Sequence, residues 1–405
     1  MEKVNVAVIG LGLRGHGILF SLLMHMDNVS VVSVCDVYED RLNESADRVE
    51  KECGRRPFAS LRYEEAIDRP DVDAVLILSS WETHVPIACF AMEHGKAVGM
   101  EVCGAYTVGD CWNLVRTQER TGAPFMFLEN CCYGENELMI LNMVRKGLFG
   151  EIVQCTGGYC HDLREEISTG KERRHYRLRN YLSRNCENYP THELGPIANI
   201  LGINRGNRML HLVSMATKSV GLNAYARANP DRIDPALQTA QFAQGDVVNT
   251  LIRCAGGQTI SLTLDTTLPR AYSRNLVVRG TLGVYTEDNQ SIYLDKDFTP
   301  ADHFRWKGHW GNVEDYRKDY QHPIWVEYRQ NGIRGGHGGM DGLVYDAFIE
   351  CVRKGEPCPI DVYDAAAWMC ITPLSEQSIR NGSAPVEIPD FTCGHWQDRA
   401  PVTFL

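Results

Sequence analysis

The strongest constraint on the fold lies at the start of the chain, in the segment VNVAVIGLGLRGHG. Its glycines, Gly10, Gly12 and Gly15, have the spacing G-x-G-x-x-G directly after an apolar run at 4–10. The first permits a tight turn, the second lets the backbone approach a pyrophosphate, and the third lets a helix pack closely on the strand. The N-terminus of that helix supplies N–H groups and the positive end of its dipole to an anion. The segment therefore predicts a βαβ unit that binds a dinucleotide.

An acidic residue at the end of the next apolar run indicates which dinucleotide this is. Asp36 follows the run VVSVC and lies about 20 residues beyond the glycines, as the dinucleotide fingerprint requires. A carboxylate at this place accepts hydrogen bonds from the ribose hydroxyls and repels a 2′-phosphate. We therefore expect NAD rather than NADP as the cofactor.

The rhythm of the first 130 residues predicts a parallel sheet. Short, nearly continuous apolar runs alternate with helix-length segments, and such strands are buried on both faces. The expected strands are 4–10, 31–36, 72–80, 97–102 and 124–130. Residues 1–130 are thus predicted to form an α/β, doubly wound Rossmann domain.

The rhythm changes after residue 130. A helix is expected at 135–150, and then come several apolar runs without helices of matching length between them, before two late helices. This pattern favours an α+β domain with a mainly antiparallel sheet. The expected strands are 151–160, 247–255, 258–267, 275–280 and 283–287, and the expected late helices are 341–354 and 363–381. Residues 131–405 are predicted to form the substrate-binding and catalytic domain.

Composition excludes several classes of function. A net charge of −11 disfavours a nucleic-acid partner. No apolar run approaches the roughly 20 residues of a membrane helix, and the start has no features of a signal peptide, so a cytoplasmic protein without membrane contact is expected. The fifteen cysteines contain no C-x-x-C pair and are expected to be buried, reduced thiols. No metal site is predicted.

Two further segments carry residues suited to chemistry. In SSWETH (79–84), at the carboxyl edge of the third expected strand, Trp81 and His84 could contact the cofactor or simply pack within the loop. In ENYPTHELGP (187–196), Tyr189 and His192 are three residues apart where a proline predicts the start of a helix. On a helix they would share one face, and histidine is suited to acid–base work near neutrality.

With these features the chain resembles the glucose-fructose oxidoreductase/inositol dehydrogenase (Gfo/Idh/MocA) family over both domains. Members usually carry a lysine after the fourth strand and an aspartate four residues before a catalytic histidine. Here Val102 and Asn188 stand at those positions, and only His192 remains. The departures argue against an ordinary polyol dehydrogenase.

A narrower resemblance accounts for these departures. The blocks GGYCHDLR, YPTHELGPIANILGINRGNR, GHGGMDG and DVYDAAAWMCITPLSEQSI are similar to glycoside hydrolase family 109, whose type activity is α-N-acetylgalactosaminidase. The resemblance implies a glycosidase that uses NAD without net redox change. The sugar is oxidised at C3, the C2 proton is removed, the glycosidic oxygen leaves C1, water adds, and the ketone is reduced again. This route is an exception to the two-carboxylate scheme of most glycosidases.

The resemblance also implies site residues. The catalytic residues would be His192, Tyr159 and Tyr189. Substrate contacts are implied at Tyr159, Arg177, Tyr189, Thr191, His192 and Tyr272, with Glu129 as a further candidate. Cofactor contacts are expected at Gly10, Gly12, Leu13, Arg14, Gly15, Asp36, Trp81, Glu82, Thr83, His84, Glu101, Val102 and Asn130.

Two points stay open at this stage. Which of Tyr159, Tyr189 and Tyr272 acts on C2 is undecided, although the glycines before Tyr159 suggest room for a ligand there. The segment GHGGMDG (336–342) is interpreted either as a substrate-binding segment or as a turn into a helix capped by Asp341.

The predicted partner is a small glycoside or glycopeptide, and a homodimer is possible. Two other functions compete with the glycosidase. One is a sugar oxidoreductase with net turnover of NAD(H), and the other is a binding protein that keeps NAD as a structural ligand.

Overall fold

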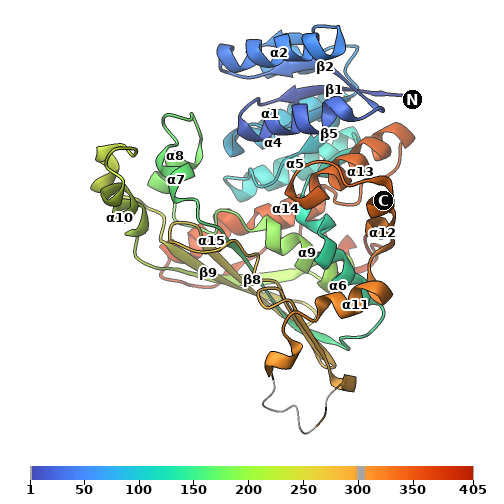
Figure 1. Ribbon diagram of the computed structural model, residues 1–405, viewed down its shortest axis with the longest axis vertical. Coiled ribbons are helices and arrows are strands. Elements are labelled where there is room, and N and C mark those ends of the chain that lie inside the picture. Colours follow the sequence, from blue (N-terminus) through green and yellow to red (C-terminus); the bar gives the residue numbers. More distant parts are fainter. Residues whose placement is uncertain (1, 298, 300–305, 405) are drawn as a thin grey trace. The chain divides into compact units, whose positions relative to one another are not determined.

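The computed structural model describes residues 2–297, 299 and 306–404 and divides them into two compact units. The first unit comprises 2–133, 327–369 and 402–404, and the second comprises 134–326 and 370–401. Helix α12 (Pro323–Asn331) connects them along the chain. Figure 1 labels the principal elements of both units.

The first unit is built on a six-stranded sheet in the order β3-β2-β1-β4-β5-β6, with every pair parallel. The strands are β1 (Val4–Ile9), β2 (Val29–Cys35), β3 (Phe58–Ser60), β4 (Ala74–Ile77), β5 (Ala97–Met100) and β6 (Phe125–Phe127). This order is that of a Rossmann fold, so the predicted doubly wound sheet is confirmed. Only β3 was missed, because Phe58–Ser60 does not form an apolar run, whereas the equally short β6 lies within one.

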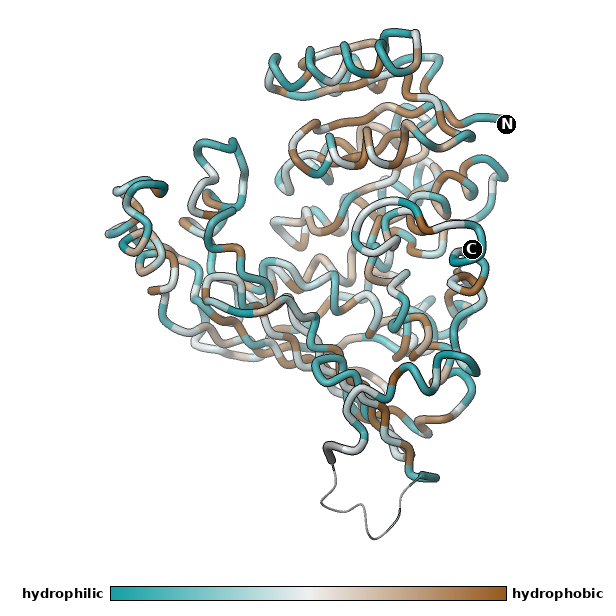
Figure 2. Tube along the Cα trace, in the orientation of Figure 1, coloured by the Kyte–Doolittle hydropathy of each residue, from teal (hydrophilic) through white to brown (hydrophobic). Residues whose placement is uncertain are grey.

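Helices connect these strands and cover the sheet. They are α1 (Leu13–Ser21), η1 (Leu23–His25), α2 (Glu39–Cys53), α3 (Tyr63–Ile67), α4 (Trp81–Glu93), α5 (Val108–Thr121) and η2 (Asn130–Tyr133). In Figure 2 the tube of α2 is largely hydrophilic, whereas the strands of the sheet are largely hydrophobic. This contrast is expected of a helix that lays one narrow apolar stripe on a buried parallel sheet.

The late segment 327–369 belongs to the first unit, which differs from the predicted division at residue 130. It contains η7 (His337–Gly339), α13 (Met340–Lys354) and α14 (Val362–Met369). Helix α13 packs on β1 and η2, and α14 packs on α5 and β6. The backbone N–H of Phe127 also donates to the carbonyl of Ile360 (3.0 Å). Sequence periodicity could not reveal this return, since an apolar helix face does not specify its partner. As functional domains, 1–130 and 131–405 stay a prediction.

The second unit is built on an eight-stranded sheet in the order β13-β12-β11-β7-β10-β9-β8-β14. Only β7 and β10 pair in parallel, so the predicted mainly antiparallel sheet is confirmed. The strands are β7 (Ile152–Cys160), β8 (Met209–Ala216), β9 (Val247–Cys254), β10 (Thr259–Asp265), β11 (Val277–Gly280), β12 (Gly283–Thr286), β13 (Ser291–Leu294) and β14 (Val386–Glu387).

The helices of the second unit lie between and after these strands. They are α6 (Glu135–Arg145), α7 (Arg164–Ser168), α8 (Arg177–Ser183), α9 (Thr191–Leu201), α10 (Gly221–Ala228), α11 (Val313–Tyr320) and α15 (Ile371–Arg380). Shorter 3-10 turns are η3 (Pro235–Gln238), η4 (Asp295–Asp297), η6 (Trp306–His309) and η8 (His395–Gln397). The helix expected over 363–381 is divided into α14 and α15, because Pro373 has no N–H for the carbonyl of Met369.

One face of the second sheet is packed and the other is open. Along β9, Val248, Ile252 and Cys254 are buried, whereas the alternating positions are exposed. Helix α9 packs on β7, and α15 packs on β8. The buried face therefore positions α9, which begins directly after Pro190 as the sequence predicted.

The cysteines are free, and most of them are buried, as expected of reduced thiols in a long chain. Within the part of the chain that the structure describes, no helix combines the length and apolarity that crossing a membrane would require.

Candidate active site

The glycine loop of the first unit has the geometry that a dinucleotide needs. Gly10 adopts φ +97°, and a Cβ there would lie 2.6 Å from the backbone of Ser79. A Cβ on Gly15 would lie 1.9 Å from the carbonyl oxygen of Gly10, so α1 can approach β1 only because that residue is glycine. Leu13 follows the loop with 81% of its surface exposed. An open backbone loop with an exposed apolar side chain fits a nucleotide cofactor.

Asp36, at the end of β2, is buried and oriented by two backbone groups. The N–H of Leu11 donates to Asp36 Oδ2 (2.7 Å), and the N–H of Tyr38 donates to Oδ1 (2.9 Å). A carboxylate has about four acceptor positions, so two of them are left for a ribose diol.

We expect Asp36→Ala to lower NAD affinity at least about tenfold, since two charge-assisted hydrogen bonds to the ribose would be lost. Titration calorimetry measures the change, with thermal unfolding of the NAD-free variant as the control for folding. NAD affinity equal to that of the wild type would show that Asp36 does not bind the ribose.

The segment SSWETH lies at the carboxyl end of β4 and the start of α4. His84 is buried, with Nδ1 3.2 Å from the carbonyl oxygen of Cys103 and Nε2 3.0 Å from that of Ser79. Burial lowers its pKa, and the two carbonyls offset part of this effect. Both ring nitrogens face the loop, which favours packing over a ribose contact. Trp81 is also buried, whereas Glu82 is exposed and Thr83 is partly exposed.

The predicted cofactor residues beyond β5 and β6 are joined by hydrogen bonds. Arg14 Nε donates to Glu101 Oε1 (2.8 Å), and the Arg14 guanidinium also binds Asp341. Asn130, the first residue of η2, donates to the same Asp341. Val102 is buried, and its N–H donates to Glu101 Oε2 (3.2 Å). The segment GHGGMDG, left open by the sequence, thus joins the cofactor loop.

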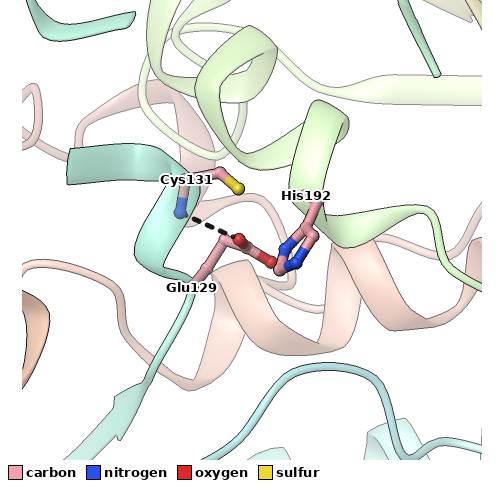
Figure 3. Close-up of side chains that lie close together, drawn as sticks. All are labelled: Glu129, Cys131 and His192. Carbon is pink, nitrogen blue, oxygen red and sulfur yellow. Dashed lines mark hydrogen bonds between the residues drawn. The ribbon is translucent and has the colours of Figure 1, made fainter. Parts of the chain in front are cut away.

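Glu129 is fully buried between β6 and η2. Its Oε1 accepts the backbone N–H of Cys131 (3.1 Å), as Figure 3 shows. This bond fixes the carboxylate at the end of the strand. Its predicted role with substrate or water stays a prediction.

In the second unit the structure brings together most of the predicted sugar-binding residues. Tyr159 is the penultimate residue of β7, and its ring stacks on that of Tyr189 with centroids 4.2 Å apart. His192, in the first turn of α9 (Figure 3), has its ring 5.6 Å from Tyr159 and 4.7 Å from Tyr189. Arg177 lies 5.0 Å from the ring centre of Tyr189. These four side chains, which we call the aromatic cluster, are all buried.

Arg177 gives the aromatic cluster a fixed positive charge. Burial opposes that charge, but nearby Tyr176, Tyr159 and Glu166 outweigh burial and hold the Arg177 pKa well above its ordinary value. Arg177 Nε lies 2.7 Å from Glu166 Oε1. A cation among phenols can stabilise a phenolate, which a tyrosine must form to act as a base.

His161 is a neighbour of the cluster that the sequence did not single out. Its Nδ1 lies 3.3 Å from the Tyr159 hydroxyl, and its ring is 5.1 Å from that of the half-exposed Tyr272. Burial lowers the His161 pKa, and neighbouring Glu166 opposes that effect. The block GGYCHDLR contained this signal, because His161 follows Tyr159 by two residues directly after the end of β7.

The sequence suggests that the glycines before Tyr159 leave room for a ligand, but neighbouring atoms occupy that space. A Cβ on Gly157 would lie 2.6 Å from the Cβ of Glu193, and one on Gly158 would lie 2.8 Å from the carbonyl oxygen of Thr263. Gly158 thus lets β10 approach β7, and Gly157 lets α9, which carries His192, lie close to β7.

Asn188 precedes Tyr189, Thr191 precedes His192, and both Asn188 and Thr191 are buried. Asn188 stands where the broader family has an aspartate. Its Nδ2 donates to Gln244 Oε1 (2.5 Å), and its Oδ1 accepts Cys186 Sγ–H (3.3 Å). Asn188 is therefore engaged in packing and does not orient His192 as a carboxylate would.

Glu187, fully buried before Tyr189, is held by its backbone. Its N–H donates to Ser375 Oγ, and its carbonyl accepts Thr372 Oγ1–H, both at 2.8 Å. Burial raises the pKa of the Glu187 carboxyl to about 8, although the backbone N–H of Tyr189 offsets part of the shift. The folded protein thus keeps this carboxyl protonated at neutral pH.

This shift predicts a loss of stability as pH rises. The unfolded chain releases the Glu187 proton near pH 4.3, whereas the folded chain keeps it to about pH 8. Between these values the folded state binds more protons, so the free energy of unfolding falls with pH. Glu187→Gln should flatten this fall in thermal unfolding at pH 5, 7 and 9, whereas Glu44→Gln, on an exposed position of α2, should not. An unchanged pH slope in Glu187→Gln would contradict the assignment.

The fold defines a class: a two-domain protein with an NAD-binding Rossmann domain and an α+β domain built on a mainly antiparallel sheet. Residues 4–128 match the family model described as "Oxidoreductase family, NAD-binding Rossmann fold", and residues 133–398 match "Glycosyl hydrolase 109, C-terminal domain". The chain belongs to glycosyl hydrolase family 109. It is an NAD-dependent glycosidase, and the predicted family, cofactor and class of enzyme are confirmed.

Relatives of known name extend over nearly the whole chain. A glycosyl hydrolase family 109 protein of Stenotrophomonas maltophilia is 38% identical and covers 99% of this chain and 92% of its own. The α-N-acetylgalactosaminidase of Tannerella forsythia is 38% identical, covering 94% and 86%. That of Shewanella oneidensis is 36% identical, covering 99% and 88%.

Solved structures share the fold at lower identity. Levoglucosan dehydrogenase, in complex with NADH and levoglucosan, superposes with a TM-score of 0.69 at 18% identity, covering 96% of this chain and 100% of its own. Myo-inositol 2-dehydrogenase from Lactobacillus plantarum gives 0.66 at 15% identity, with the same coverage.

Proposed function

We propose that this protein hydrolyses terminal α-N-acetylgalactosaminides by transient oxidation of the sugar at C3. The relatives from Tannerella forsythia and Shewanella oneidensis bear the name α-N-acetylgalactosaminidase. The observation that carries the proposal is the aromatic cluster with its buried arginine, which offers acid–base groups for a sugar ring.

When bound, NAD⁺ supplies reversible oxidation of the C3 hydroxyl, and this acidifies the C2 proton. We assign the C3 hydroxyl proton to His192, whose imidazole can accept and return it. We assign the C2 proton to Tyr159, because its hydroxyl lies beside His161 Nδ1 and Arg177 favours its ionised form. Tyr189, stacked on Tyr159, orients it and contacts the sugar.

Arg177, Thr191, Tyr272 and Glu129 are proposed to hold the substrate.

Two features favour hydrolysis over net dehydrogenation. Val102 supplies no amine where sugar dehydrogenases of the broader family have a lysine, and Asn188 is bonded to Gln244 where they have an aspartate. The residues that usually assist net dehydrogenation in the broader family are therefore missing.

A panel of chromogenic α- and β-glycosides, assayed with and without added NAD, tests the proposal. We expect release of the aglycone from the α-N-acetylgalactosaminide with NAD present at far less than one equivalent. Stoichiometric NADH together with oxidised sugar would identify an oxidoreductase. A protein that binds NAD but does neither would be a binding protein.

We also propose a homodimer through the open face of the eight-stranded sheet. Met215 on β8 and Leu251 on β9 are 63% and 59% exposed there, and exposed apolar residues on a sheet face are typical of an interface. Analytical ultracentrifugation of the wild type and of Leu251→Glu would test this proposal. A dimeric wild type and a monomeric variant are expected, and a monomeric wild type would contradict the proposal.

A further inference from the structure

Asp341 is a buried carboxylate in the first turn of α13, within the first unit. The preceding loop leaves space for it, since a Cβ on Gly336 would lie 2.8 Å from Asp341 Oδ2. A carboxylate in the first turn also benefits from the positive end of the helix dipole. The alternative interpretation of Asp341 as a helix cap is wrong, because Gly339 is the N-cap of α13 and the Asp341 carboxylate accepts hydrogen bonds from Arg14 and Asn130 instead.

Both carboxylate oxygens of Asp341 bind residues far away in sequence. Arg14 Nη1 donates to Oδ2 (2.7 Å) and Arg14 Nη2 donates to Oδ1 (3.0 Å), a two-point ion pair. Asn130 Nδ2 donates to Oδ1 (2.8 Å), and His337 Nδ1 lies 2.9 Å from Oδ2. One carboxylate therefore holds the loop after β1 and the loop after β6 together.

The charge of Asp341 matches this role. Burial alone would raise its pKa, but His337 and Arg14 outweigh burial and hold it well below its ordinary value. The carboxylate is thus ionised throughout the neutral range. A neutral amide at the same place would turn an NH₂ group toward Arg14 or Asn130, both of which are donors.

The groups held by Asp341 lie on one half of the nucleotide site. In a sheet of order β3-β2-β1-β4-β5-β6 the two halves of a dinucleotide bind on opposite sides of the switch point beside β1. Asp36, after β2, belongs to the adenosine half. Glu101 and Asn130, after β5 and β6, belong to the other half, and Tyr345 of α13 donates to Glu101 Oε1 (3.2 Å). Helix α13, which lies far beyond residues 1–130 in the sequence, thus binds the residues expected to contact the nicotinamide half of NAD.

We propose that Asp341 is a positioning residue for the nicotinamide half of NAD, acting through Arg14 and Asn130. The inference rests on the proposal that those two residues contact NAD. It predicts that a change at Asp341 lowers the affinity for NAD but leaves the binding of the adenosine half unchanged.

The test measures NAD and AMP affinities of Asp341→Asn by titration calorimetry. NAD affinity should fall about tenfold, whereas AMP affinity should stay within about twofold of the wild type, because AMP uses only the half held by Asp36. Equal loss for both ligands, or no loss for NAD, would overturn the proposal. Asp346→Asn is the matched control, because its carboxylate, on the same helix, pairs with the exposed Arg334 (2.6 Å).

Arg14→Gln and the double variant Arg14→Gln/Asp341→Asn distinguish the proposed contact of Arg14 with NAD from the positioning role of Asp341. If Arg14→Gln leaves NAD affinity unchanged, the proposed Arg14 contact is wrong. If it weakens NAD and Asp341→Asn does not, Asp341 has no positioning role. Non-additive losses in the double variant are expected if the two act together. Should Asp341→Asn fail to fold, Asp341→Glu keeps the charge, shifts the oxygens, and is expected to weaken NAD but not AMP.

Discussion

Replacing His192 by Ala, or Tyr159 by Phe, is expected to lower kcat at least about 100-fold while NAD affinity stays that of the wild type. Acid–base groups contribute about 100-fold to 10,000-fold to enzymatic rates. His192 and Tyr159 lie in the second unit, with ring centroids 5.6 Å apart, whereas the glycine loop and Asp36 lie in the first. Loss of either side chain should therefore impair the chemistry of the sugar and spare the cofactor.

Matched variants make this result interpretable. Tyr225→Phe removes a hydroxyl that donates to Glu165 near the surface, and His211→Ala removes an exposed imidazole on β8. Both should keep wild-type kcat. A kcat near that of the wild type in Tyr159→Phe would show that another residue removes the C2 proton. Tyr189→Phe would then be the next variant to measure.

Hydrolysis in D₂O is expected to place deuterium at C2 of the released sugar. If oxidation at C3 precedes elimination, the C2 proton is lost and regained in every turnover, whereas a conventional glycosidase leaves the C2–H bond intact. Nuclear magnetic resonance of the product distinguishes the two. Because the leaving group departs by elimination, thio-linked substrates should be cleaved as well.

Protium retained at C2 after many turnovers would exclude the elimination mechanism, whatever the rate of hydrolysis. The control is the same incubation with the Asp36→Ala protein at a low NAD concentration. Both hydrolysis and exchange should decline in parallel there, since both depend on the bound cofactor.

The local features of the cofactor site were predictable because they are encoded within a few residues. The spacing of Gly10 and Gly15, and the position of Asp36 at the end of a strand, follow directly from the backbone geometry of a βαβ unit. The start of α9 after Pro190 was predictable for the same reason.

Long-range pairings were not predictable in this way. Nothing near Arg14 indicates that its partner is Asp341, and nothing near Tyr159 indicates that Gly157 is the contact point of α9. His161 was missed because a single histidine at the end of a strand is usually a packing residue. Only the fold shows that its ring lies between Tyr159 and Tyr272.

The return of residues 327–369 to the first unit has a consequence for the order in which the protein is made. A ribosome extends a chain at about 5–20 residues per second, so on the order of 10–40 s pass between the emergence of the glycine loop's sheet and that of α13. During this interval β1 and η2 lack the helix that packs on them, and Arg14 lacks Asp341. The nascent nucleotide site therefore matures only after the eight-stranded sheet of the second unit has been synthesised, and a fragment ending at residue 130 should bind NAD poorly.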